Sequence, residues 1–173
     1  MAPETFLYRA LLAKVHSQNK IAVATATSGV AASIMPGGRT AHSRFKIPLT
    51  IDSGGYCSFT KQSGTTTLLR TASLISWDEV SMIKKQAVEA LDNSMRDIMD
   101  RLDLPFGGKT IVFGEDFRQV LPDVKKGSRA QIVDASLRRS YLWDYMRHLK
   151  LVRNMRAHSD HGLLNIFCAL ATE

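Results

Sequence analysis

The part of the sequence best suited to chemistry is a pair of acids, Asp78 and Glu79, at the end of a short and mostly apolar run, residues 74–77. Such a run is typical of a buried strand, and α/β sheets bind their ligands at the carboxyl ends of strands. Two neighbouring carboxylates there suit phosphoryl transfer, in which one holds the Mg²⁺ shell and the other polarises the attacking water. Acids also favour helix N-termini, so the alternative that this pair only begins the next helix stays open.

The segments around these acids alternate between helical and extended patterns. Helices are predicted over residues 5–18, 30–35, 83–102 and 141–146, and strands over 20–26, 109–113 and 148–152. Residues 39–71 are rich in Gly, Ser and Thr and predict loops and short elements over the edge of a sheet. Because strands alternate with helices, the fold class is α/β, with a mostly parallel sheet covered by helices.

The longest of these helices, over residues 83–102, is amphipathic, and its outer face is expected to carry two ion pairs. Asp92 stands four residues before Arg96, and Asp97 stands four residues before Arg101. Side chains at this spacing are neighbours on a helix surface, where each pair stabilises the helix by roughly 0.2–0.5 kcal/mol.

Composition and charge limit the class of protein. With 173 residues the chain is long enough for one domain with a sizeable core. Its 23 basic and 16 acidic residues give a net charge of +7, which favours a polyanionic partner such as nucleic acid, although a solvated basic face explains the excess as well. The two cysteines form no metal-ligand pattern. No apolar run approaches the length that crosses a membrane, and no feature calls for an obligate oligomer.

Several segments, taken in order, resemble a known family. They are Ala-Thr-Ala-Thr-Ser-Gly-Val-Ala-Ala at 24–32 with Gly-Gly-Arg-Thr-Ala-His-Ser at 37–43, Trp-Asp-Glu-Val-Ser-Met at 77–82, Asp-Phe-Arg-Gln-Val-Leu-Pro at 116–122, and Leu-Val-Arg-Asn-Met-Arg at 151–156. This order resembles the petite-integration-frequency (Pif) family of superfamily-one DNA helicases, most of all the plant branch carried by rolling-circle transposons. The likeness covers about residues 5–159.

The resemblance implies both a fold and an activity. Members of this family are ATP-dependent motors that unwind DNA from 5′ to 3′ with two RecA-like domains. The implied fold is the first RecA-like P-loop NTPase domain, over residues 1–157. The implied cofactors are ATP and Mg²⁺, and the implied partner is single-stranded or forked DNA, in DNA repair, recombination and telomere maintenance. The nucleus or the mitochondrion is the expected compartment, although the sequence shows no targeting signal.

The motifs also imply roles for single residues in nucleotide hydrolysis. Asp78 matches the acid that holds the magnesium shell, and Glu79 matches the acid that activates water. Gln119 matches the glutamine that senses the γ-phosphate, and Arg156 matches the arginine that stabilises charge on the transferring group. These roles fit phosphoryl transfer, which depends on positioning and electrostatic stabilisation.

A second set of residues matches the segments that face DNA in this family. Thr27 and Ser28 match the motif whose hydroxyls and backbone amides contact phosphates, at a predicted turn from strand to helix. His42 and Ser43 lie in the next such segment. For His42 a structural or solvated role stays an equal alternative.

The sequence departs from the family at the phosphate-binding loop. Where the family has Gly-Gly-Thr-Gly-Lys-Thr, this chain has Met-Ala-Pro-Glu-Thr, and only Thr5 matches as a cofactor-binding residue. Glu4 replaces the lysine that neutralises the phosphates, and Pro3 lacks the backbone donor that would cradle their oxygens. Glu115 also replaces the second of two glycines that precede the glutamine motif, which puts the approach of Gln119 in doubt.

Both ends of the sequence suggest a cause for this departure. Codons can be chosen for residues 2–5 that encode Gly-Thr-Gly-Lys-Thr when they are read in a neighbouring frame with one A restored. Codons chosen for residues 161–173, read from their third base, encode a sequence that resembles the family's continuation after the arginine motif. We therefore hypothesise that residues 158–173 are a divergent, frame-shifted tail and that the chain is a truncated copy. Genomic codons without family sequence in another frame would contradict this. In the present frame the apolar spacing of the tail predicts an amphipathic helix.

Two alternatives to an active motor stay open. One is a catalytically silent RecA-like module that binds DNA, and the other is a pseudogene product that folds poorly.

Overall fold

The computed structural model describes residues 3–51, 54–115, 122, 124, 127–151 and 164–169, with the backbone alone at 3–5, 150–151 and 164–169. Its helices and strands are α1 (Pro3–Ser17), β1 (Ile21–Ala26), α2 (Gly29–Ser33), β2 (Arg39–Thr40), α3 (Ala41–Phe45), α4 (Gly64–Thr71), β3 (Ala72–Asp78), α5 (Lys85–Met99), β4 (Ile111–Glu115), α6 (Arg129–Asp134), β5 (Met146–Leu151) and β6 (Leu164–Ala169). Short 3₁₀ helices are η1 (Val80–Met82), η2 (Pro105–Gly108), η3 (Leu137–Arg139) and η4 (Tyr141–Tyr145).

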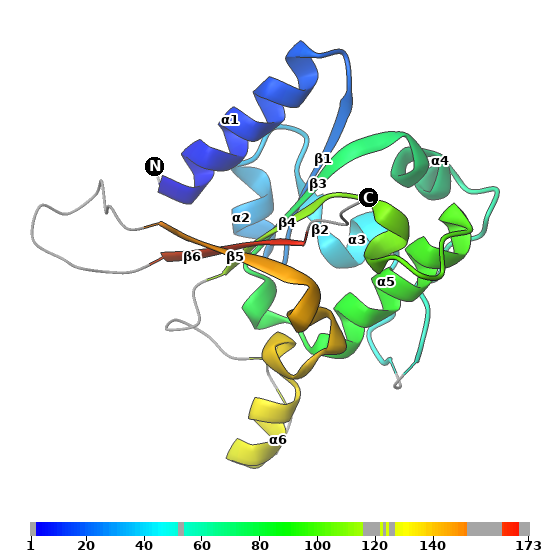
Figure 1. The fold of residues 1–173 in the computed structure, drawn as a ribbon. Coiled ribbons are helices and arrows are strands. Elements are labelled where there is room, and N and C mark those ends of the chain that lie inside the picture. The colour runs from blue at the N-terminus through cyan, green and yellow to red at the C-terminus, as the bar shows by residue number, and fades with distance from the viewer. Residues whose placement is uncertain are drawn as a thin grey trace, which may run out of the picture.

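The strands form one six-stranded sheet in the order β2-β1-β3-β4-β6-β5, and the first four strands run parallel (Figure 1). The register between β1 and β3 sets Ala26 beside Asp78, and the register between β3 and β4 sets Trp77 beside Phe113. The parallel strands therefore end at one edge of the sheet. The predicted α/β fold with a mostly parallel sheet is confirmed.

Two apolar cores lie on the two faces of this sheet. Val23, Ile75, Trp77, Ile111 and Phe113 enter one core, and Ala24, Ala26, Leu74 and Val112 enter the other. Successive strand residues point to opposite faces, so a strand buried on both faces is apolar at nearly every position. Helices α3, α4 and α5 cover the first face, and α1 and α2 cover the second (Figure 1).

An aromatic cluster fixes the strand that carries the acids. The ring of Trp77 is fully buried and lies 5.5 Å from the ring of Phe45 and 6.1 Å from that of Phe113, between ring centroids. Phe106 extends the cluster at 5.9 Å from Phe113. Tilted pairs at such distances contribute about 0.5–1.5 kcal/mol each beyond the burial of their area. Asp78 therefore follows a residue that is held from two sides.

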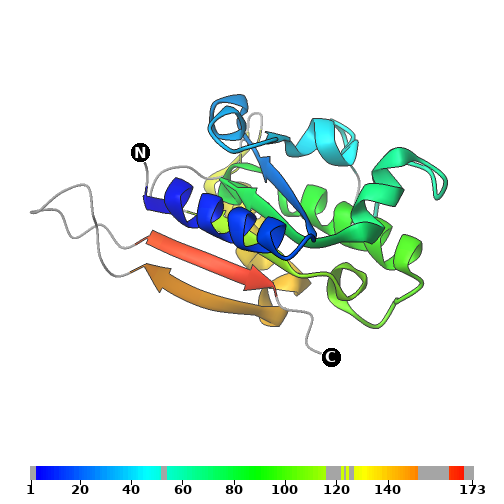
Figure 2. The same ribbon diagram turned by 90° about the horizontal axis from the view of Figure 1, so that it is seen from above.

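The tail does not form the predicted helix. Residues Leu164–Ala169 form strand β6, which pairs antiparallel with β4 on one side and with β5 on the other (Figure 2). Without β6, the backbone N–H and C=O groups along one side of β4 would lack partners in the sheet, and such an open edge attracts a strand. Pairing with that edge outweighs the helical spacing of the apolar residues. The strand predicted over 148–152 is present as β5, but only as the outer partner of β6.

The loop region over residues 39–71 contains more regular structure than predicted. It includes the edge strand β2, the short helix α3 and the eight-residue helix α4, whose N-cap Ser63 accepts a hydrogen bond from the amide of Thr66. Among the described residues no helix has both the length and the apolar composition to cross a membrane.

The prediction that Asp92 lies on the outer face of α5 is wrong. This carboxylate is completely buried, because η2 and η4 pack over it. It accepts hydrogen bonds from Nε of Arg96 at 2.7 Å, from the hydroxyl of Tyr141 at 2.6 Å and from the amide of Phe106. Burial and this contact raise the pKa of Tyr141 well above its usual value. Asp97 is half exposed and pairs with Lys61 at 2.8 Å, not with Arg101.

We predict that Asp92→Ala lowers the free energy of unfolding by about 3 kcal/mol, because it removes the buried acceptor of three donors: the partly buried guanidinium of Arg96, the buried amide of Phe106 and the hydroxyl of Tyr141. Urea denaturation measures this change. Asp97→Ala is the matched control on the same helix, and it should cost less than about 1 kcal/mol because an exposed pair contributes little. Equal losses in the two variants would contradict a central role for Asp92.

Candidate functional site

Asp78 and Glu79 lie half-buried at the carboxyl end of β3. Glu79 adopts a left-handed backbone conformation, with φ 55° and ψ 37°, and its amide donates to Oδ1 of Asp78 at 2.9 Å. Only the three-residue helix η1 follows, where Glu79 makes no side-chain capping bond, and α5 begins at Lys85. The alternative that the two acids simply begin a helix is therefore not supported.

The environment of Asp78 disfavours its charge. Burial raises the pKa of this carboxyl above its usual value, and the neighbouring charge of Glu79 raises it further. Hydrogen bonds from the Glu79 amide and from the hydroxyl of Tyr8 act in the opposite direction. Asp78 is thus a carboxylate whose ionised form depends on the donors around it, and a bound cation would favour that form.

The structure joins Thr27 and Ser28, the predicted DNA-facing residues that follow β1, to these acids. The amide of Thr27 donates to the carbonyl of Asp78 at 3.0 Å, and the amide of Ser28 donates to Oε2 of Glu79 at 3.1 Å. The indole of Trp77 donates to Oγ1 of Thr27 at 3.1 Å. The hydroxyl of Ser28 caps α2 by accepting from the amide of Ala31. The ends of β1 and β3 therefore form one hydrogen-bonded unit.

His42 and Ser43 lie at the same edge of the sheet. They belong to α3, which begins directly after β2, the strand paired with β1. Ser43 is exposed, and His42 is half-buried, so that burial lowers the pKa of the imidazole and keeps it neutral at pH 7. A neutral imidazole adds no charge attraction for phosphate, so a DNA contact by His42 stays a prediction.

The structure does not place the side chains of three predicted site residues. Gln119 and Arg156 lie outside the described residues, and Thr5 is described only as part of the backbone of α1. Convergence of these side chains on a nucleotide remains a prediction. Glu115 is described, and its side chain is buried at the end of β4.

Sequence reasoning missed Tyr8. This side chain of α1 is completely buried, and its hydroxyl donates to Oδ1 of Asp78 at 3.3 Å. Gly114 of β4 lies so close that a Cβ at this position would be 1.6 Å from the Tyr8 oxygen and 2.6 Å from Oδ1 of Asp78. A tyrosine among the apolar residues of a helix is a usable signal, because a buried phenol needs a partner for its hydroxyl.

The described residues fit a magnesium ion but not a complete phosphate site. They contain no group of three or more His, Cys, Asp or Glu side chains that could hold a metal. Mg²⁺ in nucleotide sites keeps several waters and takes its other ligands from phosphates, so one partly buried carboxylate such as Asp78 suffices. At the phosphate-binding loop, however, the sequence has Pro3 and Glu4 in place of a donor and a cation, so this segment does not fit a triphosphate.

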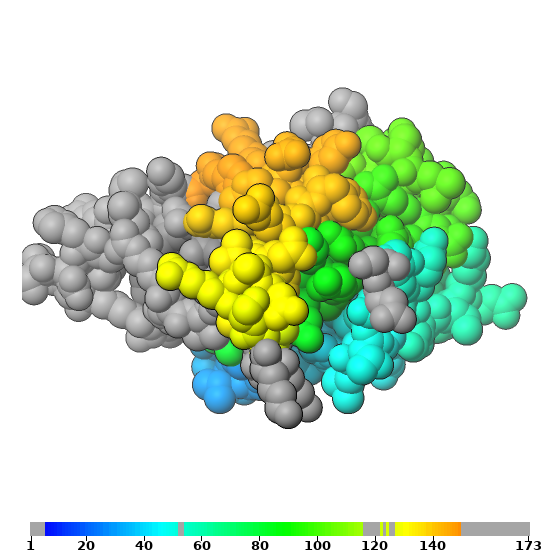
Figure 3. Space-filling model, turned by 90° about the horizontal axis from the view of Figure 1, so that it is seen from below, coloured from blue at the N-terminus to red at the C-terminus, as the bar shows by residue number. Residues whose placement is uncertain are grey.

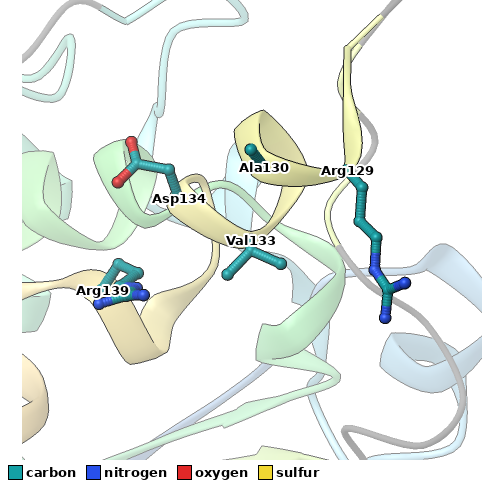
Figure 4. A pocket seen from close by; sticks show the side chains of 5 residues that line it. All are labelled: Arg129, Ala130, Val133, Asp134 and Arg139. Atoms are coloured by element: carbon teal, nitrogen blue, oxygen red, sulfur yellow. The ribbon is translucent and has the colours of Figure 1, made fainter.

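A separate hollow of about 490 Å³ lies along α6 and includes none of the predicted site residues. Helix α6 lies on the outside of the molecule and buries none of its side chains (Figure 3). Arg129 and Arg139 flank Ala130 and Val133, with Asp134 on the same helix (Figure 4). This charged surface is open to the two interpretations given above, a track for DNA or a solvated face.

Comparisons with known proteins agree on one family. The family model described as PIF1-like helicase matches residues 2–163. Two proteins of Trypanosoma brucei brucei are similar: the ATP-dependent DNA helicase PIF4 is 28% identical over 123 residues, and PIF1 is 32% identical over 117 residues. Each match covers 68% of this chain but only 15% and 11% of those proteins.

Solved structures give the same result. Bacteroides Pif1 bound to ssDNA shares 30% identity and a TM-score of 0.61 over 75% of this chain and 30% of that one. Bacteroides Pif1 helicase in complex with ADP-AlF3 and ssDNA shares 26% identity and a TM-score of 0.66 over 80% of this chain and 32% of that one. The fold is therefore a RecA-like helicase domain, and the chain belongs to the PIF1-like helicase family.

Proposed function

We propose that this chain is the first RecA-like domain of an ATP-dependent DNA helicase that moves from 5′ to 3′ on single-stranded or forked DNA. The observation that carries the proposal is the hydrogen bond from the Ser28 amide to the Glu79 carboxylate, which ties a DNA-facing turn to a catalytic acid. Two similar solved structures are Bacteroides Pif1 helicases with ssDNA, one also with ADP-AlF3. The chain spans about a third or less of its relatives, so this activity belongs to a larger motor.

Each residue of the site has a distinct role in this proposal. Asp78 holds the magnesium shell, Glu79 polarises the attacking water, Gln119 senses the γ-phosphate and Arg156 stabilises charge on the transferring group. Mg²⁺, when bound, would neutralise part of the charge on the phosphates. Thr27, Ser28, His42 and Ser43 contact the DNA backbone, which positions the strand without reading its sequence.

We propose further that the chain by itself binds DNA without turning over ATP. Glu4 would repel a triphosphate, and Thr5 alone does not replace the missing donors. The chain alone then acts as the silent DNA-binding module considered above. Three further points also stay predictions. They are membership of the plant transposon branch, a frame shift at both ends of the chain (residues 2–5 and the tail over 158–173), and action on nuclear or mitochondrial DNA in repair, recombination and telomere maintenance.

We predict that the chain binds single-stranded oligothymidylate with an affinity that falls as salt rises, because bound phosphates release counterions. Ser43→Glu places a negative charge at the exposed carboxyl edge and should weaken binding at least about threefold at about 50 mM salt, measured by fluorescence anisotropy. The difference should shrink at high salt.

Ser17→Glu is the matched control for this measurement. Ser17 is also an exposed serine, but it ends α1 at the opposite edge of the sheet, so the same change in net charge should leave DNA affinity nearly unaltered. Equal effects of the two variants would show that only overall charge matters, and salt-independent binding would argue against a phosphate-tracking surface.

We also predict that ATP turnover by the chain, with or without DNA, equals that of Asp78→Asn within error in a radiolabelled phosphate-release assay. Turnover above this control would contradict the inactivity of the chain.

Replacing residues 1–5 by Gly-Gly-Thr-Gly-Lys-Thr should restore binding of a fluorescent ATP analogue in the presence of Mg²⁺, because it returns the lysine and the backbone donors. Absence of binding in a folded variant would show that these residues are not what prevents it.

A further inference from the structure

Asp78 receives two hydrogen bonds on the same oxygen. The hydroxyl of Tyr8 and the amide of Glu79 both donate to Oδ1, at 3.3 and 2.9 Å. Among the described residues no hydrogen bond to the other oxygen, Oδ2, is present. The two donors come from different elements, α1 and the turn after β3, and therefore hold the carboxylate from two sides.

The space around this arrangement is closed on the side of β4. A Cβ at Gly114 would lie 1.6 Å from the Tyr8 oxygen, 2.8 Å from its Cζ and 2.6 Å from Oδ1 of Asp78. The phenol ring itself is fully buried in the apolar core that also contains Leu12 and Val112. The hydroxyl can therefore approach Oδ1 only because residue 114 has no side chain.

We propose that Tyr8 is a positioning residue for the magnesium carboxylate, holding Oδ1 of Asp78 so that Oδ2 meets the metal shell. This inference rests on the proposed magnesium role of Asp78. The hydrogen bonds from the Tyr8 hydroxyl and the Glu79 amide hold Oδ1 in place and leave Oδ2 for the metal shell. Because α1 begins within the expected phosphate-binding segment, at Pro3, Tyr8 also connects the helix that carries part of this segment to the acid.

The test removes the hydroxyl alone. In Tyr8→Phe the pKa of Asp78, followed by the ¹³C resonance of its carboxyl, should rise above that of the unsubstituted protein. When Mn²⁺ is added alone, it should broaden the amide resonances of residues near Asp78. In Tyr8→Phe the half-saturating Mn²⁺ concentration should be at least about threefold higher, because a carboxylate that is less fixed binds metal more weakly. Unchanged values for both quantities in a folded variant would overturn the proposal.

Two controls separate this inference from the proposed function. Tyr141→Phe also removes a tyrosine hydroxyl bonded to an aspartate, but the aspartate is Asp92 and the hydrogen bond is only partly buried, so the pKa of Asp78 and the Mn²⁺ titration should not change. Asp78→Asn should abolish the broadening. If Mn²⁺ broadens the unsubstituted protein and Asp78→Asn equally, the magnesium role fails, whereas a response that needs Asp78 but ignores Tyr8→Phe defeats only the positioning role.

A second variant decides the question if Tyr8→Phe folds poorly. Replacement of Tyr8 by 3-fluorotyrosine keeps the ring and makes the hydroxyl a stronger donor. The pKa of Asp78 should then fall below that of the unsubstituted protein, with tighter Mn²⁺ binding. An unchanged or raised pKa would contradict a hydrogen bond that controls the carboxylate.

Discussion

The site depends on the close parallel packing of β1, β3 and β4, whose register brings their carboxyl ends to one edge of the sheet. The Asp78 carbonyl accepts a hydrogen bond from the amide of Thr27, directly after β1. Gly114 of β4 has no side chain and so leaves room for the Tyr8 hydroxyl beside the Asp78 carboxylate. Trp77, one residue earlier, fixes β3 through its contacts with Phe45 and Phe113. Because each strand end is held by its neighbour, a shift of any one strand would displace the acids.

The same constraint joins the acid proposed for hydrolysis to the turn proposed to face DNA. The Ser28 amide holds Glu79 while the Ser28 hydroxyl caps α2, so the turn after β1 has a structural task even without a ligand. A phosphate that approached this turn would meet an amide already bonded to the carboxylate of Glu79. Such direct contact is a physical basis for coupling between two sites, because a ligand at one alters the hydrogen bonding at the other.

The sequence predicted most of this edge and little of what supports it. The apolar run before Asp78 and the turn at Thr27 and Ser28 were readable because strand length and the change from apolar to polar residues are local signals. The burial of Asp92 was not readable, since i,i+4 spacing does not show which face of a helix η2 and η4 will cover. The contact of Tyr8 with Asp78 joins residues 70 positions apart, and no local pattern contains it.

The antiparallel pair β5 and β6 has a consequence for how the chain folds. The parallel pairings join segments far apart in the sequence, such as Ala26 with Asp78, whereas Leu151 and Leu164 of β5 and β6 are 13 positions apart in the sequence. Local contacts close with a smaller loss of chain entropy and therefore form earlier in folding. The pairing of β5 with β6 therefore closes with a smaller loss of chain entropy than the pairing of β1 with β3, and β6 completes the sheet by pairing with β4.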